Sequence, residues 1–332
     1  MKEDDICMDK PVDDTMLQSV IKEFEGTLVK NNPVRQEKLA FTLPKAHKRH
    51  SSIRPRDIYE EIGKTVYGQE EAKRTLSVIL YEHLLRQKDG CRGRDIPKTN
   101  ALLIGPSGCG KTLIAKSMAE VAKVPFVRID ASSLVTRGYR GGMHVEQIMD
   151  ILLNASNGHK TIASRGIIFL DEIDKIATTD ADWELATGHV QNELLSIIDG
   201  ADLYHETTHL EYERDTFSFK DVLIIFGGSF ERKWTNINDR QDLVSYGLVP
   251  ELVNRMGTII RMEQSSADVL IQMIRPAVEE YSAILDLDRD EKTLYTELLS
   301  SIIKADKELI KMGGRCVGPL VRKFFEDRLF EL

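Results

Sequence analysis

A glycine-rich segment, GPSGCGKT at residues 105–112, has the residue types and spacing of a phosphate-binding loop. It follows the apolar run ALLIG and precedes KTLIAKSMAEVAK, whose apolar residues repeat at helical spacing. In that order of strand, loop and helix, backbone N–H groups turn toward phosphate oxygens and the helix N-terminus adds partial positive charge. We expect Lys111 to reach the β- and γ-phosphates of a nucleotide and Thr112 to hold Mg²⁺. The alternative is a chance glycine-rich turn, which the flanking elements disfavour.

A second group of charged residues ends the apolar run in GIIFLDEIDKI, residues 166–176. Four apolar residues bring Asp171 to the carboxyl end of a buried strand, the edge at which open α/β sheets bind ligands. We expect Asp171 to hold Mg²⁺ through water and Glu172 to polarise the attacking water. An acidic pair that only starts a helix is the alternative. The position after a buried strand favours hydrolysis over binding alone.

The elements around these residues alternate between apolar strands and helical patterns from residue 57 onward, which predicts an α/β fold with a parallel sheet covered by helices on both faces. After Met262 only helical patterns follow. We therefore predict an N-terminal extension over residues 1–55, a nucleotide-binding domain over 56–262 and a smaller all-α domain over 263–332. The predicted strands are residues 101–105, 125–131, 166–171, 221–228 and 257–262.

The extension at residues 1–55 differs from the rest. A helix is expected near residues 14–24, and the basic stretch after it is broken by prolines. A solvated linker and a partner-binding arm both remain open for this segment.

Composition narrows the class of protein. The 332 residues include 45 basic and 53 acidic ones, a formal net charge of −8, so there is no global basic footprint for nucleic acid. The four cysteines stand singly, and we expect neither a disulfide framework nor a cysteine-built zinc site, which fits a reducing, cytoplasmic location. No apolar run approaches the roughly 20 residues that span a bilayer, and the acidic N-terminus lacks the order of a signal peptide.

These motifs, with others in the same order, resemble the AAA+ ATPases of the ClpX/HslU branch from about Ile53 to the C-terminus. The resemblance implies an AAA+ P-loop fold with a helical lid, ATP and Mg²⁺ as cofactors, Walker A and Walker B motifs, and a homo-oligomeric ring, a hexamer in the family. The matching segments are VYGQEEAKRTLSVILYEHLLR, GYRG, GHVQNELLSIIDG, FGGSF, DLVSYGLVPELVNRMG and GGRCVGPLVRKFF.

The resemblance also implies residue roles. Arg255 would be the arginine finger that enters a neighbour's site, and Arg315 would read the γ-phosphate from the small domain; for either arginine alone, a surface salt bridge is the alternative. With Asp171, Glu172 and Lys111 they form the expected catalytic set. Nucleotide contacts are expected from Val66, Tyr67, Gly105, Pro106, Ser107, Gly108, Cys109, Gly110, Lys111, Thr112, Leu113 and Arg315.

GYRG, residues 138–141, occupies the position of the family's aromatic pore loop, so Tyr139 is expected to grip a polypeptide in a central channel. Packing of Tyr139 on its own surface is the alternative. Arg140 departs from the aliphatic residue typical of the family, and a cation beside the ring suits acidic chains or a phosphate backbone. The acidic segment 178–188 stands where the second pore loop belongs and disfavours nucleic acid in the channel. The expected function is an ATP-dependent unfoldase or remodelling chaperone acting on proteins. The alternative is a nucleic-acid-associated motor or recruitment ATPase.

Several parts of the family pattern are missing. The four-cysteine pattern of the family's zinc-binding N-terminal domain does not occur, so this domain is not expected, and residues 1–50 become the candidate for recruiting substrates or an adaptor. No Ile-Gly-Phe tripeptide lies between Phe230 and Asp242, so docking on the ClpP peptidase in the usual way is not expected. Ser229 is the nearest residue to the polar sensor-1 position, and a structural turn is the equal alternative.

Residues 205–209 read HETTH, which matches the H-E-x-x-H zinc-protease pattern with Glu206 as base between His205 and His209. Two threonines are poor helix formers, and the segment lies just before the strand expected at 221. We expect a loop of exposed histidines, with an adventitious metal site as the alternative. Cys109 is interpreted as a small residue that fits a tight turn, with oxidant sensitivity as the alternative.

Overall fold

A five-stranded parallel sheet lies at the centre of the computed structural model, which describes residues 53–87, 96–136, 141–178, 181–205 and 215–330. The strand order is β2-β5-β8-β1-β9, and every neighbouring pair is parallel. The predicted α/β fold is therefore confirmed, and each predicted strand segment contains a strand of this sheet. The strands are β1 Ala101–Ile104, β2 Phe126–Asp130, β5 Ile167–Asp171, β8 Leu223–Gly228 and β9 Thr258–Arg261.

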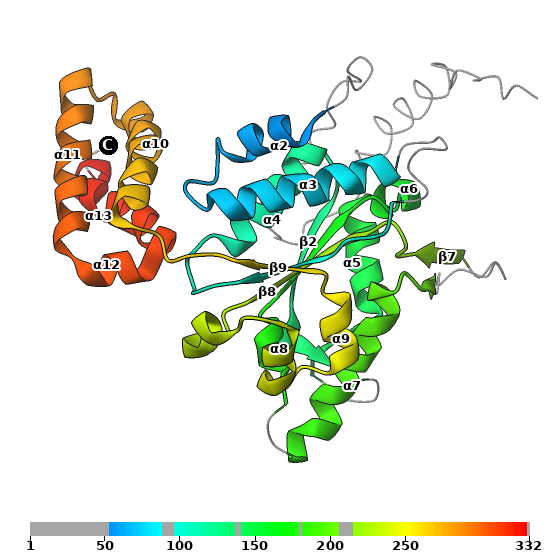
Figure 1. Ribbon diagram of the computed structural model, residues 1–332. Helices are drawn as coiled ribbons and strands as arrows, with labels where there is room; N and C mark the ends of the chain where they lie inside the picture. The colour runs from blue at the N-terminus through cyan, green and yellow to red at the C-terminus, as the bar shows by residue number, and fades with distance from the viewer. Residues whose placement is uncertain (1–52, 88–95, 137–140, 179–180, 206–214, 331–332) are drawn as a thin grey trace, which may run out of the picture. The chain divides into compact units, whose positions relative to one another are not determined.

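Helices cover both faces of the sheet, and each face contributes apolar residues to a cluster with them (Figure 1). Alternate residues of β5 belong to different clusters: Ile167 and Phe169 lie in one, Ile168 and Leu170 in the other. The first face packs against α2 Pro55–Ile62, α3 Glu70–Arg86 and α4 Lys111–Ala122. The second packs against α5 Gln147–Ala155, α7 Ala181–Ile198, α8 Arg240–Tyr246 and α9 Pro250–Arg255.

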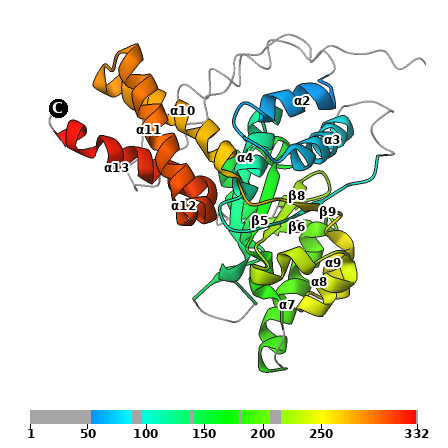
Figure 2. The same cartoon turned by 60° about the vertical axis from the view of Figure 1, so that its left-hand side comes forward.

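The chain after β9 is helical and has an apolar cluster of its own, which includes Leu270, Ile303 and Phe325 (Figure 2). Its first two long helices begin at capped positions: the Ser266 hydroxyl accepts from the backbone of the third helical residue, and Asp288 forms a capping box. The helices are α10 Ala267–Leu285, α11 Arg289–Ala305, α12 Lys307–Met312 and α13 Val317–Phe330. This separate cluster supports the division we propose at Met262.

Several small elements complete the described chain. They are β3 Leu134–Val135, β4 Met143–His144, α6 Lys160–Ala163, β6 Asp202–His205 and β7 Asp215–Ser218, with 3₁₀ turns at Ala131–Ser133, Ile173–Ile176, Glu231–Asn236 and Gly313–Cys316. β3 pairs with β4 in parallel, and β6 pairs with β7 in antiparallel fashion.

Some predicted features fall outside the described residues or differ in form. The helix expected at 14–24 and the basic arm lie outside them, as do Glu206 to His209. His205 ends a strand, so its backbone is not helical there. The segment assigned to a second pore loop is helical from Ala181, since it contains good helix formers such as Leu185 and Ala186. Within the described ranges, no helix has the length and apolarity to span a bilayer, and no three potential metal-binding side chains gather.

A buried histidine ties α3 to the sheet side of the fold. His83 is 3% exposed, and its Nε2 lies 3.1 Å from the carbonyl oxygen of Arg165. Burial lowers the pKa of His83 from 6.5 to about 4 and outweighs the contact with the Arg165 carbonyl, which raises it; the charges of Arg86 and Lys98 lower it further, and that of Asp221 raises it. The folded protein therefore holds this imidazole neutral at pH 7.

The free energy of unfolding of the wild-type protein is expected to fall as the pH drops from 6.5 toward 4. In this range His83 is protonated in the unfolded state but stays neutral in the folded state. The loss from this group is at most about 3 kcal/mol and is absent above pH 6.5. His83→Gln keeps an N–H donor for Arg165 and does not titrate, so its free energy of unfolding should vary less over this range. Urea unfolding at pH 7.5 and pH 5 measures the difference between the two proteins, and equal pH dependences would contradict the prediction.

Candidate nucleotide-binding site

The phosphate loop lies between β1 and α4, as the sequence predicts, and two of its glycines have left-handed backbone angles. Gly108 has φ 82° and Gly110 has φ 99°. A Cβ atom on Gly108 would lie 2.3 Å from the carbonyl oxygen of Met312, and the Gly314 N–H donates to the Gly108 oxygen at 3.1 Å. The glycine is therefore needed for backbone conformation and for the close approach of the turn before α13.

Lys111 is the first residue of α4 and is 9% exposed. Its Nζ donates to the carbonyl oxygens of Gly105 at 2.6 Å and Pro106 at 3.0 Å. The ammonium group thus lies against the loop that is expected to surround the phosphates. Gly105 and Pro106 act through these carbonyls, and they are not among the residues that line the cavity described below.

Asp171 and Glu172 lie at the carboxyl end of β5, as predicted. Asp171 is 7% exposed, and its Oδ1 accepts the Glu172 N–H at 3.0 Å. Glu172 has φ 57°, a left-handed conformation that is uncommon for a residue with a side chain and that occurs at functional sites. Because of this backbone turn, the side chains of Asp171 and Glu172 leave the end of β5 in different directions.

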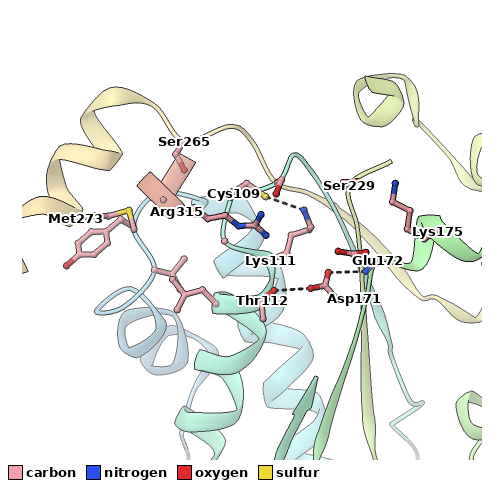
Figure 3. Close-up of a pocket in the computed structure, with 17 residues that line it drawn as sticks. Cys109, Lys111, Thr112, Asp171, Glu172, Lys175, Ser229, Ser265, Met273 and Arg315 are labelled. Atoms are coloured by element: carbon pink, nitrogen blue, oxygen red, sulfur yellow. Dashed lines mark hydrogen bonds between the residues drawn. The ribbon is translucent and has the colours of Figure 1, made fainter. Parts of the chain in front are cut away.

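Two oxygen atoms of the kind that Mg²⁺ prefers lie together here. The Thr112 hydroxyl donates to Asp171 Oδ2 at 3.3 Å (Figure 3). A hydroxyl and a carboxylate at this spacing, beside a phosphate loop, fit a Mg²⁺–nucleotide complex in which the ion keeps several waters. Thr112 and Asp171 are the residues that would hold the ion.

A cavity of about 360 Å³ connects these groups with residues from the helical C-terminal part. Figure 3 shows Arg315 directed toward the phosphate loop, where Lys111 lies. The lining contains the predicted residues Val66, Tyr67, Ser107, Gly108, Cys109, Gly110, Lys111, Thr112, Leu113, Asp171, Glu172 and Arg315. It also contains Lys175, Ser229, Ser265, Met273 and Gly314, and among these five the sequence motifs single out only Ser229.

Ser229 follows β8 and binds a buried acid. Its hydroxyl donates to Asp174 Oδ2 at 3.0 Å, and its N–H donates to Oδ1 at 3.1 Å, while the Phe230 N–H also donates to Oδ2. Asp174 therefore organises the turn at the end of β8. The interpretation of Ser229 as a structural residue gains support, and its position in the cavity lining keeps the sensor-1 interpretation open.

Gln69 links the phosphate loop to the start of the C-terminal part, and no sequence motif predicts this contact. The Gln69 amide donates to the carbonyl oxygens of Cys109 at 3.3 Å and Glu263 at 2.7 Å, and its oxygen accepts the Glu263 N–H at 3.1 Å. Cys109 is 4% exposed, and burial raises the pKa of its thiol, which supports its interpretation as a packing residue.

Arg255, which is also predicted to act in catalysis, does not line this cavity. Arg255 ends α9, where its guanidinium pairs with Asp199 and its Nη1 donates to the Glu251 carbonyl at 3.0 Å. The structure does not bring Arg255 to its own chain's cavity. Tyr139 and Arg140 lie outside the described residues.

The fold and this site define a P-loop ATPase of the AAA+ class. A family model described as AAA domain (Cdc48 subfamily) matches residues 96–259. The chain is 31% identical to the ATP-dependent Clp protease ATP-binding subunit ClpX 2 of Wolinella succinogenes over 346 aligned positions, which cover 94% of this chain and 84% of that protein. It is 30% identical to ClpX of Borrelia duttonii, covering 84% of this chain and 74% of that protein, and 29% identical to ClpX of Porphyromonas gingivalis, covering 86% and 79%. The chain belongs to the ClpX-like AAA+ ATPases.

Proposed function

We propose that this chain is an ATP-driven protein unfoldase or remodelling chaperone that works as a homo-oligomeric ring, a hexamer as in the family, and threads polypeptide through a central pore. The observation that carries the proposal is one cavity lined by the phosphate loop, the carboxylates of Asp171 and Glu172, and Arg315 from the helical C-terminal part. When bound, Mg²⁺ supplies charge neutralisation at the phosphates. Lys111 and Arg315 bind phosphate oxygens, Thr112 and Asp171 hold the ion, and Glu172 accepts a proton from the attacking water.

The ring proposal rests on Arg255. Its guanidinium is directed to Asp199 on the surface of its own chain, and no cavity-lining residue is its partner. An arginine that stabilises charge on the transferring phosphoryl group must reach the phosphates, and here a second copy would have to supply it. The proposed active site is therefore complete only where two subunits meet.

The pore proposal rests on Tyr139. The strands β3 and β4 pair in parallel on either side of the segment that carries it, so Leu134 and Met143 hold its two ends together. Gly141 has φ 104° and open space around the position of a Cβ atom. These described residues on either side of the segment support the proposal that Tyr139 belongs to a pore loop.

Tyr139→Ala is expected to abolish ATP-dependent unfolding of a model protein while at least about half of the ATPase activity remains. The reason is that the tyrosine side chain is proposed to contact the threaded polypeptide and not the nucleotide. The test is to follow the loss of fluorescence as a folded fluorescent reporter protein is unfolded, and to measure phosphate release in the same reaction. Tyr139→Phe keeps the aromatic ring and should retain unfolding. If the ATPase is stimulated by DNA with a steep salt dependence, and not by unfolded protein, the nucleic-acid-associated alternative replaces the proposal.

The proposed function does not include docking on the ClpP peptidase. Between Phe230 and Asp242 the chain forms the 3₁₀ turn Glu231–Asn236 and then begins α8 at Arg240, which supports the absence of a long docking loop there. We propose that the ring works in the cytoplasm without ClpP docking in the usual way and recruits an adaptor or substrate through residues 1–50. Co-elution of the chain with ClpP in size-exclusion chromatography would contradict this.

A further inference from the structure

An arginine on β2 reaches the carboxylate of Asp171. β2 pairs with β5 so that Arg128 lies opposite Phe169, two residues before Asp171. In β2, Val127 and Ile129 belong to the apolar cluster under α5 and α7, and Phe126 packs against the cluster under α4. Since side chains alternate along a strand, Arg128 lies on the α4 face, the face on which Thr112 lies.

The contacts made by Arg128 are close and specific. Its Nη2 lies 2.8 Å and its Nε 3.0 Å from Asp171 Oδ2. The acid is nearly buried, with a side chain that is 10% exposed, whereas the arginine side chain is 50% exposed. The guanidinium therefore approaches an inward carboxylate from the solvent side, and it has room to move away.

The same carboxylate oxygen is the one that faces the metal-binding hydroxyl. Asp171 Oδ2 also accepts from Thr112 Oγ1 at 3.3 Å, while Oδ1 is engaged by the Glu172 N–H. Three donor atoms thus converge on Oδ2, which has two lone pairs. A cation or a metal-bound water can therefore bind Oδ2 only after the guanidinium has moved away from it.

We propose that Arg128 is a positioning residue that competes with Mg²⁺ for Asp171 and so sets the Mg²⁺ concentration at which nucleotide binds. The guanidinium holds Asp171 Oδ2 toward Thr112, and binding of the Mg²⁺–nucleotide complex must displace it. Two positive charges cannot share one carboxylate oxygen without repulsion. This inference rests on the proposed role of Asp171 as a metal-holding residue.

The test measures nucleotide binding and not turnover. In the full chain carrying Glu172→Gln, fluorescence of a methylanthraniloyl derivative of ATP is followed while Mg²⁺ is added. Arg128→Met and Arg128→Gln should each lower the half-saturating Mg²⁺ concentration by roughly three- to tenfold, the size expected on removal of a close ion pair that is partly screened. Binding of Mn²⁺, followed by its paramagnetic resonance signal with ADP present, should tighten in the same direction.

Matched variants separate competition from a general charge effect. Arg56→Met removes another exposed arginine, which pairs with Glu60 at 3.3 Å on α2, and should leave the Mg²⁺ dependence unchanged. Arg128→Lys keeps the charge without the guanidinium fork and should fall between the parent and Arg128→Met. Unfolding curves of the two uncharged variants show whether the fold is kept, and either folded variant decides the question.

The outcomes distinguish this inference from the proposed function. A half-saturating Mg²⁺ concentration that is unchanged or higher in a folded, uncharged Arg128 variant overturns the competition. If the parent binds nucleotide independently of Mg²⁺, or binds none, then the metal-holding role of Asp171 fails, and the proposed function fails with it.

Discussion

Replacing Glu172 with Gln is expected to lower the rate of ATP hydrolysis by about 10²- to 10³-fold while ATP binding stays close to that of the wild type. Glu172 lines the cavity beside Asp171 and follows directly on the buried end of β5. An amide has nearly the same shape as the carboxylate but cannot accept a proton from water. Phosphate release and equilibrium binding of a fluorescent nucleotide, measured on the same preparation, test the two halves of the prediction.

Glu120→Gln is a matched control, because Glu120 is an exposed acid on α4 that pairs with Lys116 at 3.8 Å. This change should leave hydrolysis within about twofold of wild type. If Glu172→Gln kept a comparable rate, the proton-accepting role would be wrong. A chain that binds ATP without hydrolysing it should also retain protein clients, so a pull-down with Glu172→Gln is expected to enrich them.

The second large effect is expected for Arg255. Arg255→Ala should reduce the ATPase rate of the assembled protein by about 10²- to 10³-fold with little change in nucleotide binding, since the arginine is proposed to act on the transferring phosphoryl group of a neighbour. Phosphate release at a chain concentration above that needed for assembly measures the effect. A loss that reflected only a broken ion pair would be small, because both partners of the pair are partly exposed.

Asp199→Asn is the control for that alternative. It removes the charge that holds Arg255 on its own chain and leaves the arginine intact. We expect this variant to hydrolyse ATP within a few-fold of wild type. If Asp199→Asn lost as much activity as Arg255→Ala, the ion pair itself would be the functional feature.

Much of this fold was predictable because its signals are local. Buried parallel strands are continuous apolar runs, and both ALLIG and GIIFLD form strands of the central sheet at the predicted places. The phosphate loop is also local: glycine, lysine and threonine act within a few residues of one another. These parts lie in one cavity in the structure, whereas their roles in catalysis remain predictions.

Other features depend on which strands become neighbours, and local patterns do not carry that information. The Arg128 contact exists because β2 pairs with β5 in one register, and a shift of one residue would turn the side chain to the other face. Gln69 reaches Cys109 and Glu263, 40 and 194 positions away along the chain. The strand that ends at His205, the first residue of HETTH, similarly depends on its pairing with β7.

The shared active site is the central claim, and mixing two inactive variants tests it most directly. Arg255→Ala subunits keep Glu172, and Glu172→Gln subunits keep Arg255. In a ring formed from equal amounts of both, about a quarter of the interfaces would join an intact site to an intact arginine, so hydrolysis should return to roughly that fraction of the wild-type rate. Mixing Arg255→Ala with the double variant should restore nothing. If the two single variants assemble together and hydrolysis does not return, or if Arg255→Ala is fully active as a single subunit, the account is contradicted.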